Sequence, residues 1–469
     1  MGEWKGKSAW SIADNFAQQA LSFVIFALLA RWLTPHAFGL LAIAHLMVLF
    51  ARMSILDAIA MPVVRAPTAS NALFDWLFTL CCVAALLLAA VMALLSPLLA
   101  SFFDAPELLP VLLGMSLAIV LNGLVRAHEA RLLREGNFRL LAIRSIVSVS
   151  CGGALALYLA LRGAGAMALV AQQLATGLIA LLIAVVAEWR IWRPHWRWSN
   201  ALIRTHAREM QKVSTSALLN YANNNGDAAL VSVLFGPTAT GLYNLVKRVL
   251  SAAYLIIGAS LGRVGISLFV QQQSDPALLR RSYARMLGMT LLLLVPVYAL
   301  VTALAEPMVV IVFGEQWRPS APLFGWLSVI YLAQAIFALG QNLSFATGHS
   351  ARVPKLALTQ LLIAVACALL FMRWLGVMGI AAGFAIGSLL GMLAMQRAIA
   401  RQLDFSLRSM LLTVLPMGIG AVMGTAFLRV LAPAGLQITG WFTLFFAGAS
   451  GLLAYALSAA LVGRFVNRS

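Results

Sequence analysis

Long apolar stretches recur along the whole chain, and this recurrence is the feature that most constrains its fold. Residues 77–95, 361–371 and 441–462 are almost entirely apolar and lack the alternation of apolar and polar residues seen in barrel strands. In a bilayer the backbone must satisfy its own hydrogen bonds, so a spanning segment is either a helix or a strand of a closed barrel. The sequence therefore predicts an all-α integral membrane protein.

The composition agrees, because 62% of the 469 residues are hydrophobic and only 10% are charged. Soluble domains carry about 25% charged residues, and a spanning helix needs about 20 mostly apolar residues. We predict about 14 transmembrane helices, at residues 12–34, 37–60, 74–99, 108–128, 140–161, 165–187, 213–235, 239–268, 283–305, 320–346, 354–373, 377–400, 408–430 and 438–462. The first stretch lacks a cleavage site typical of signal peptides, so we expect it to remain as a spanning helix.

Basic residues concentrate in alternate connections between the predicted helices, which accounts for the net charge of +18 without a nucleic-acid partner. The intervening connections are poor in lysine and arginine. By the positive-inside rule, this alternation predicts a multi-pass protein whose N- and C-termini both lie on the cytoplasmic side of the membrane. The longest basic connection, about residues 188–212, interleaves tryptophan with arginine, a mixture suited to the layer of lipid headgroups.

Two segments of the chain resemble each other at a spacing of 202 residues. Pro35 and Gly39 match Pro237 and Gly241, each time in the connection between two predicted helices. A second similarity relates residues 162–168 to residues 376–382. In this alignment Gly165 matches Gly379. These matches predict two parallel six-helix bundles, followed by two helices that have no counterpart in the repeat.

The predicted domain organisation follows from this repeat. It comprises an N-terminal six-helix bundle (1–195), a basic cytoplasmic linker (196–212), a C-terminal six-helix bundle (213–402) and helices 13 and 14 (403–469). Transporters built from parallel repeats bind substrate between the halves and expose it to each side in turn.

Polar side chains form a stripe on one face of the seventh predicted helix. The stripe contains Asn220, Asn223, Asn224 and Asp227 at helical spacing. Such a face is too polar to meet lipid, so it either lines a hydrated cavity or packs against another helix. The first predicted helix carries a weaker version that includes Asp14.

Basic side chains occur inside corresponding helices of the two halves. His45 and Arg52 lie seven residues apart in the second predicted helix, and Lys247 and Arg248 lie in the eighth. Arginine binds phosphate through two parallel hydrogen bonds and lysine adds a point charge, so this arrangement favours an anionic substrate.

An alternative is that these bases pair internally. Arg52 would pair with Asp57, and Lys247 with Asp227. The two interpretations are compatible, because a phosphate group of the substrate can displace the acid from an ion pair that forms in its absence. Both therefore stay open. His45 alone fits a structural histidine as well as one that binds substrate or protons.

No catalytic motif, metal-ligand pattern or nucleotide-binding sequence is recognisable in the chain. We therefore expect a transporter rather than an enzyme, without a cofactor. Energy would come from an ion gradient, from the substrate gradient or from a partner.

Several segments resemble the polysaccharide transporter family of the multidrug/oligosaccharidyl-lipid/polysaccharide (MOP) exporter superfamily. Residues 30–42, which read Ala-Arg-Trp-Leu-Thr-Pro-His-Ala-Phe-Gly-Leu-Leu-Ala, are similar to the family pattern ARxLxPxxFGxxA. Residues 62–65, 131–139 and 346–352 resemble later segments in the same order, so the resemblance covers nearly the whole chain.

This resemblance implies a flippase that moves undecaprenyl-pyrophosphate-linked oligosaccharide from the cytoplasmic to the periplasmic leaflet, by alternating access through a basic central cavity, for cell-surface polysaccharide export. Related flippases have cavity arginines in the first, second and eighth helices, and Arg52 and Lys247/Arg248 match the second and the eighth. His45 and the three asparagines would add to the binding surface. For coupling to protons or sodium, or for charge pairing, the candidates are Asp57, Asp227 and Asp14.

The expected partners are the lipid-linked oligosaccharide, membrane lipids, and polysaccharide polymerase and chain-length machinery. Two other functions remain as alternatives. A multidrug exporter of the same superfamily would typically have twelve spans and a cavity suited to cations. A membrane glycan polymerase or ligase would need a large outward loop, and none is recognisable.

Overall fold

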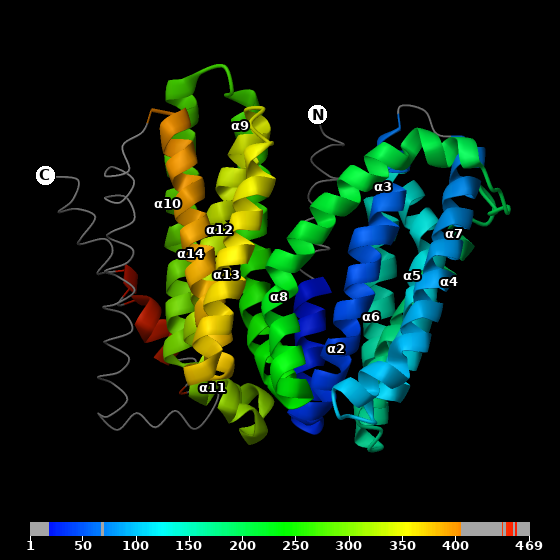
Figure 1. The fold of residues 1–469 in the computed structure, drawn as a ribbon, viewed down its shortest axis with the longest axis horizontal. Helices are drawn as coiled ribbons and strands as arrows, with labels where there is room; N and C mark the ends of the chain where they lie inside the picture. The colour runs from blue at the N-terminus through cyan, green and yellow to red at the C-terminus, as the bar shows by residue number, and fades with distance from the viewer. Residues whose placement is uncertain (1–17, 67–69, 405–442, 444–446, 454, 457–469) are drawn as a thin grey trace, which may run out of the picture. The chain divides into compact units, whose positions relative to one another are not determined.

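All regular secondary structure in the described part of the chain is helical (Figure 1). The structure is a computed structural model and describes residues 18–66, 70–404, 443, 447–453 and 455–456. Within these residues, ten helical stretches are long and apolar enough to cross a membrane. The predicted all-α, multi-pass architecture is thereby confirmed.

The chain divides into two compact units, Met1–Gly241 and Leu242–Ser469. The first contains helical residues 18–32, α2 (Pro35–Ala51), the π-helical turn η1 (Arg52–Leu56), α3 (Asp57–Arg65), α4 (Asn71–Phe102), α5 (Leu108–Glu135), α6 (Phe138–Leu161), α7 (Ala166–Glu188) and most of α8 (Asn200–Ala253). The second contains the end of α8, the π-helical turn η2 (Tyr254–Gly258), α9 (Ala259–Gln271), α10 (Pro276–Ala303), α11 (Ala305–Phe313), the 3-10 helix η3 (Glu315–Ser320), α12 (Leu323–Ala346), α13 (Arg352–Leu375) and α14 (Val377–Gln402).

The predicted helices from the second to the twelfth each coincide with a described helical stretch. The seventh and eighth share one stretch, Asn200–Gln271, which is broken at Gly236. The first predicted helix is described from residue 18 onward. The thirteenth, residues 408–430, lies outside the described residues, as does much of the fourteenth.

Corresponding helix starts in the two halves share a proline in the first turn. Thr34 caps α2 by accepting a hydrogen bond from the Ala37 N–H at 3.3 Å, and Pro35 follows in the first turn, where its missing N–H costs nothing. In α8, Gly236 has φ 74°, a conformation that favours glycine, and Pro237 begins the second helical segment. The predicted correspondence of Pro35 and Pro237 therefore holds at the level of helix starts.

These two helix starts pack against each other within the first unit. A Cβ on Gly39 would lie 1.7 Å from the carbonyl oxygen of Pro237, and one on Gly241 would lie 1.9 Å from that of Pro35. The contact is reciprocal: the glycine of each motif meets the proline of the other. Only residues without a side chain permit such close backbone approach.

Each unit repeats the packing pattern of the other. In the first, α4 packs on α5, α5 on α7, and α6 on α7; in the second, α10 packs on α12, α12 on α14, and α13 on α14. Figure 1 shows α12, α13 and α14 running side by side. The π-helical turns also correspond, because η1 and η2 begin 202 residues apart, the spacing of the sequence repeat.

The second sequence similarity holds in a shifted register. Gly165 caps α7 with φ 55° and ψ −134°, and Gly376 caps α14 with φ 57° and ψ −131°. The structural counterpart of Gly165 is thus Gly376 and not Gly379. The reason is conformational, since positive φ at the cap demands glycine, whereas Gly379 lies inside α14 and serves close packing on α13.

Packing and sequence similarity divide the chain at different places. The predicted C-terminal bundle begins at residue 213, whereas residues up to Gly241 cluster with the first unit. The boundary of a sequence repeat is defined by similarity, whereas the boundary of a compact unit is defined by contacts. The two boundaries differ wherever a helix of the second repeat packs on the first bundle. The predicted domain boundaries stay predictions.

We expect Gly39→Ala to lower the stability of the protein by about 1–3 kcal/mol, because the new methyl group overlaps a backbone atom that cannot rotate away. Thermal unfolding in detergent checks this. Gly325→Ala in α12 is the matched control, because its Cβ would meet only Thr302 at 3.8 Å, an ordinary contact. An equal fall in Tm for both variants would contradict the overlap argument.

Candidate functional site

The first part of the candidate site lies on α2 and the turn that follows it. His45 and Arg52 both have exposed side chains in the structure. Arg52 is the first residue of the π-helical turn η1, and its N–H reaches the carbonyl oxygens of Val48 and Leu49. Single π-helical turns interrupt the regular ladder and often occur at functional sites.

The second part is the polar stripe of α8. Asn220 and Asn224 are exposed and Asn223 is half-buried, whereas Asp227 is only 3% exposed. The amide of Asn224 donates to the carbonyl of Asn220 at 2.8 Å, and that of Asn223 donates to the carbonyl of Leu219 at 3.0 Å. These bonds to the preceding turn hold the two amides in fixed orientations.

Tyr221 joins these two parts within the first unit. Its hydroxyl donates to the carbonyl oxygen of Leu46 at 2.7 Å, and its ring meets Phe50 edge-on with 5.7 Å between centroids. The segment of α8 that carries Asn220 and Asn224 therefore packs on the segment of α2 between His45 and Arg52. The structure therefore places the helix that carries His45 and leads into Arg52 next to the helix that carries the asparagine stripe.

Asp57 pairs with a different base from the one predicted. Its carboxylate forms an ion pair with Arg126 of α5, so the expected pair with Arg52 is wrong. The reason lies in lateral packing, since α3 runs against α5 and brings Arg126 to the acid. Position along one helix does not reveal which neighbouring helix supplies the partner.

Arg126 belongs to a larger charged network that sequence reasoning missed. It also binds Glu129, and Glu129 receives the Arg144 guanidinium of α6 at 2.7 Å. The charge of Arg52 acts on Glu129 as well. Two acids thus meet three bases in and around this network, which leaves net positive charge beside η1.

A sequence signal for this network existed. Arg144 lies inside the fifth predicted helix, where an isolated arginine costs on the order of 2.5–3.5 kcal/mol and so calls for an acidic partner. Glu129 lay in the predicted connection before that helix, and α5 extends through it to Glu135. Because the predicted fourth helix ended at residue 128, Glu129 was not recognised as the acid that pairs with Arg144.

Lys247 and Arg248 lie on the second segment of α8, in the second unit. Lys247 is half-buried and Arg248 is exposed. Below them, Tyr298 donates to the carbonyl of Leu250 at 3.3 Å, which fixes this helix against α10. Their proposed convergence with Arg52, and the pairing of Lys247 with Asp227, stay predictions because the partners belong to different units. Asp14 lies outside the described residues.

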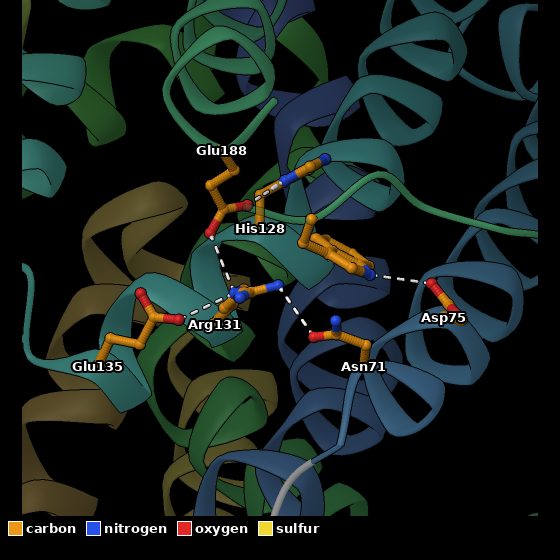
Figure 2. Close-up of polar contacts among 7 residues, drawn as sticks. Asn71, Asp75, His128, Arg131, Glu135 and Glu188 are labelled. Carbon is orange, nitrogen blue, oxygen red and sulfur yellow. Dashed lines mark hydrogen bonds and ion pairs between the residues drawn. The ribbon is translucent and has the colours of Figure 1, made fainter. Parts of the chain in front are cut away.

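A separate buried cluster ties the end of α7 to α5 and α4 (Figure 2). Glu188 forms an ion pair with His128 and lies 3.9 Å from Arg131, which also binds Glu135 at 2.9 Å. His128 and Glu188 are 1% and 2% exposed in their side chains. No group of three metal-ligating side chains occurs among the residues that the structure describes.

Comparison with known proteins gives the following likenesses. The profile of the family described as "Polysaccharide biosynthesis protein" matches residues 28–322. The succinoglycan biosynthesis transport protein ExoT of Rhizobium meliloti (strain 1021) is 29% identical over 324 residues, which cover 68% of this chain and 64% of that protein. The lipopolysaccharide biosynthesis protein WzxC of Escherichia coli (strain K12) is 23% identical over 327 residues, 70% of this chain and 66% of that protein. The matches therefore span just under two thirds of these relatives.

Solved structures show the same fold at low sequence identity. Lipid II flippase MurJ in an inward closed conformation has a TM-score of 0.76 at 12% identity, with 98% of both chains covered. An inward-facing multidrug resistance MATE family transporter of the MOP superfamily has a TM-score of 0.56 at 14% identity, covering 85% of this chain and 94% of that one. These likenesses concern the fold alone.

We expect Glu129→Gln to destabilise the protein, because it leaves two largely buried arginines without their shared acid. Loss of one partner from a fully buried pair costs about 3–5 kcal/mol, and partial exposure here reduces the expected cost to about 1–3 kcal/mol. Thermal unfolding measures it, and adding Arg144→Met should recover part of the loss.

Glu135→Gln serves as the control for this variant. It removes a pair to Arg131 whose acid side chain is 43% exposed, so its cost should stay below about 1 kcal/mol. Equal losses for the two glutamates would show that burial of the network does not govern its contribution.

Proposed function

The chain belongs to the family of polysaccharide biosynthesis proteins, and from this premise we propose that it is a flippase and not an enzyme. Its cargo in this proposal is an undecaprenyl-pyrophosphate-linked oligosaccharide, carried from the cytoplasmic to the periplasmic leaflet for export of a cell-surface polysaccharide. The names of its relatives, a succinoglycan transport protein and a lipopolysaccharide biosynthesis protein, support this class of substrate.

The observation that carries the proposal is the Tyr221–Leu46 contact, which places an exposed arginine and exposed asparagines on adjacent helices of one unit. The guanidinium of Arg52 would bind the diphosphate through paired hydrogen bonds, and His45 would add a donor. Amides of Asn220 and Asn224 both donate and accept, which suits the hydroxyl groups of sugars. Asn223 would support them from the same helix.

In this proposal, Lys247 and Arg248 would add positive charge to the diphosphate site from the second half. Alternating access of the two related halves would then expose the bound headgroup to each leaflet in turn, while the prenyl chain stays in lipid. A basic central cavity is therefore part of the proposal. The packing pattern shared by the two units supports such a two-part mechanism.

For coupling to a proton or sodium gradient, the candidates are acidic side chains. Asp227 is the stronger candidate, because its carboxylate is almost fully buried on the same helix as the asparagine stripe. Asp57 fits charge pairing better, since Arg126 already holds it. Location in the inner membrane with cytoplasmic termini, and association with polymerase and chain-length machinery, complete the proposal.

Flipping of a fluorescent undecaprenyl-pyrophosphate-linked oligosaccharide in proteoliposomes tests this function. We expect Arg52→Ala combined with Lys247→Ala and Arg248→Ala to slow flipping by at least about tenfold, because each hydrogen bond to a charged group contributes about 1.5–3 kcal/mol. Arg52→Lys should retain part of the rate, since the charge survives without the planar fork.

Arg65→Ala is the matched control, because Arg65 is an exposed arginine at the end of α3, away from η1. It should flip at the rate of the unaltered protein. Undiminished flipping by the triple alanine variant would overturn the diphosphate site.

A further inference from the structure

The segment that connects α7 to α8, residues 189–199, is fastened to α4 by three hydrogen bonds. The indole N–H of Trp192 donates to Asp75 Oδ1 at 2.9 Å, and the backbone N–H of His195 donates to the same oxygen at 3.1 Å. The backbone N–H of Arg197 donates to Thr79 Oγ1 at 2.8 Å. Asp75 and Thr79 are both buried, so this connecting segment rests on a rigid support.

The N-terminal end of the connecting segment is held by the buried cluster shown in Figure 2. Glu188 immediately precedes the segment and pairs with His128 and Arg131. The buried ring of Trp192 packs on the His128 ring with 5.0 Å between centroids, and the Arg131 guanidinium lies 5.5 Å from the centroid of the Trp192 ring. One tryptophan therefore points inward and anchors the segment.

The other large side chains of the connecting segment point outward. Trp189, Ile191, Trp196 and Trp198 are 53%, 61%, 66% and 50% exposed. Exposed bases alternate with them at Arg190, Arg193 and Arg197. The Arg193 guanidinium lies 4.9 Å from the centroid of the Trp189 ring, so apolar and cationic groups share one surface.

Positive charge continues into the first turns of α8. Residues 189–212 contain six lysines and arginines and a single acid, Glu209. That acid lies 4.0 Å from Arg65, another exposed base. The surface around the connecting segment is consequently cationic as well as aromatic.

We propose that the connecting segment is a docking surface for the headgroups of anionic phospholipids. Arginines bind the phosphate groups, while the indole rings lie among headgroups with their N–H groups toward water. The segment lies where α7 ends and α8 begins, which is the boundary of two spanning helices. An acidic protein partner would match the charge but would leave three indoles and an isoleucine without an apolar counterpart. This inference does not rest on the proposed transport function.

Quenching of tryptophan fluorescence by brominated lipids tests the proposal on the full chain. The protein is reconstituted in phosphatidylcholine vesicles that contain either dibrominated phosphatidylglycerol or dibrominated phosphatidylcholine. We expect stronger quenching by the anionic lipid, and Trp196→Phe with Trp198→Phe should remove most of the difference. Arg190→Gln with Arg193→Gln and Arg197→Gln should lower the preference for the anionic lipid by about tenfold.

The matched control replaces three exposed arginines of α10, which no tryptophans interrupt, by Arg280→Gln, Arg281→Gln and Arg285→Gln. It should leave the preference unchanged. A second pair of variants tests the anchor: Asp75→Asn keeps the accepting oxygen and the preference, whereas Asp75→Leu removes the oxygen and lowers the preference with every arginine present.

Equal quenching by the two lipids would overturn the proposal, as would a preference that survives the three changes in the connecting segment. An equal loss in the α10 control would mean that net charge alone attracts the lipid, which also overturns it. Binding of polyglutamate at the connecting segment without preferential quenching would assign the surface to an acidic protein instead.

Discussion

The free energy of placing charge in an apolar layer is the constraint on which the first unit depends. An arginine at the bilayer centre costs on the order of 2.5–3.5 kcal/mol when nothing compensates it. Arg126 and Arg144 are compensated by Glu129 and Asp57, and these four residues come from three different helices. α3, α5 and α6 must remain adjacent for these pairs to persist, so the network is a structural tie as much as an electrostatic one.

That tie gives Arg52 its distinct position. Its neighbours in the network neutralise one another, while its own side chain is exposed at the start of a π-helical turn. Arg52 is exposed, and the acids near it are already paired with Arg126 and Arg144. It can therefore bind an anion without leaving an acid uncompensated. The distinction between network arginines and an exposed arginine could be drawn only once the lateral neighbours were known.

Much of the fold follows from periodicity alone. The apolar stretches identified the second to twelfth helices, and the Pro35/Pro237 match revealed the duplication. Contacts between helices could not be obtained in this way, because spacing along a helix defines a face but not what covers it. Asp57 was accordingly assigned the nearest base in its own helix, and the His128–Glu188 pair, formed across 60 residues, was not foreseen.

The two π-helical turns have a consequence for the history of the chain. A π turn is the trace of one additional residue accommodated within an α-helix. Such a residue occurs at the same place in both copies, at Arg52–Leu56 and at Tyr254–Gly258. The simplest order of events puts this insertion in a half-length ancestor, before the gene doubled. The irregular turn would then be older than the two-part architecture, and each half would have inherited it rather than acquired it.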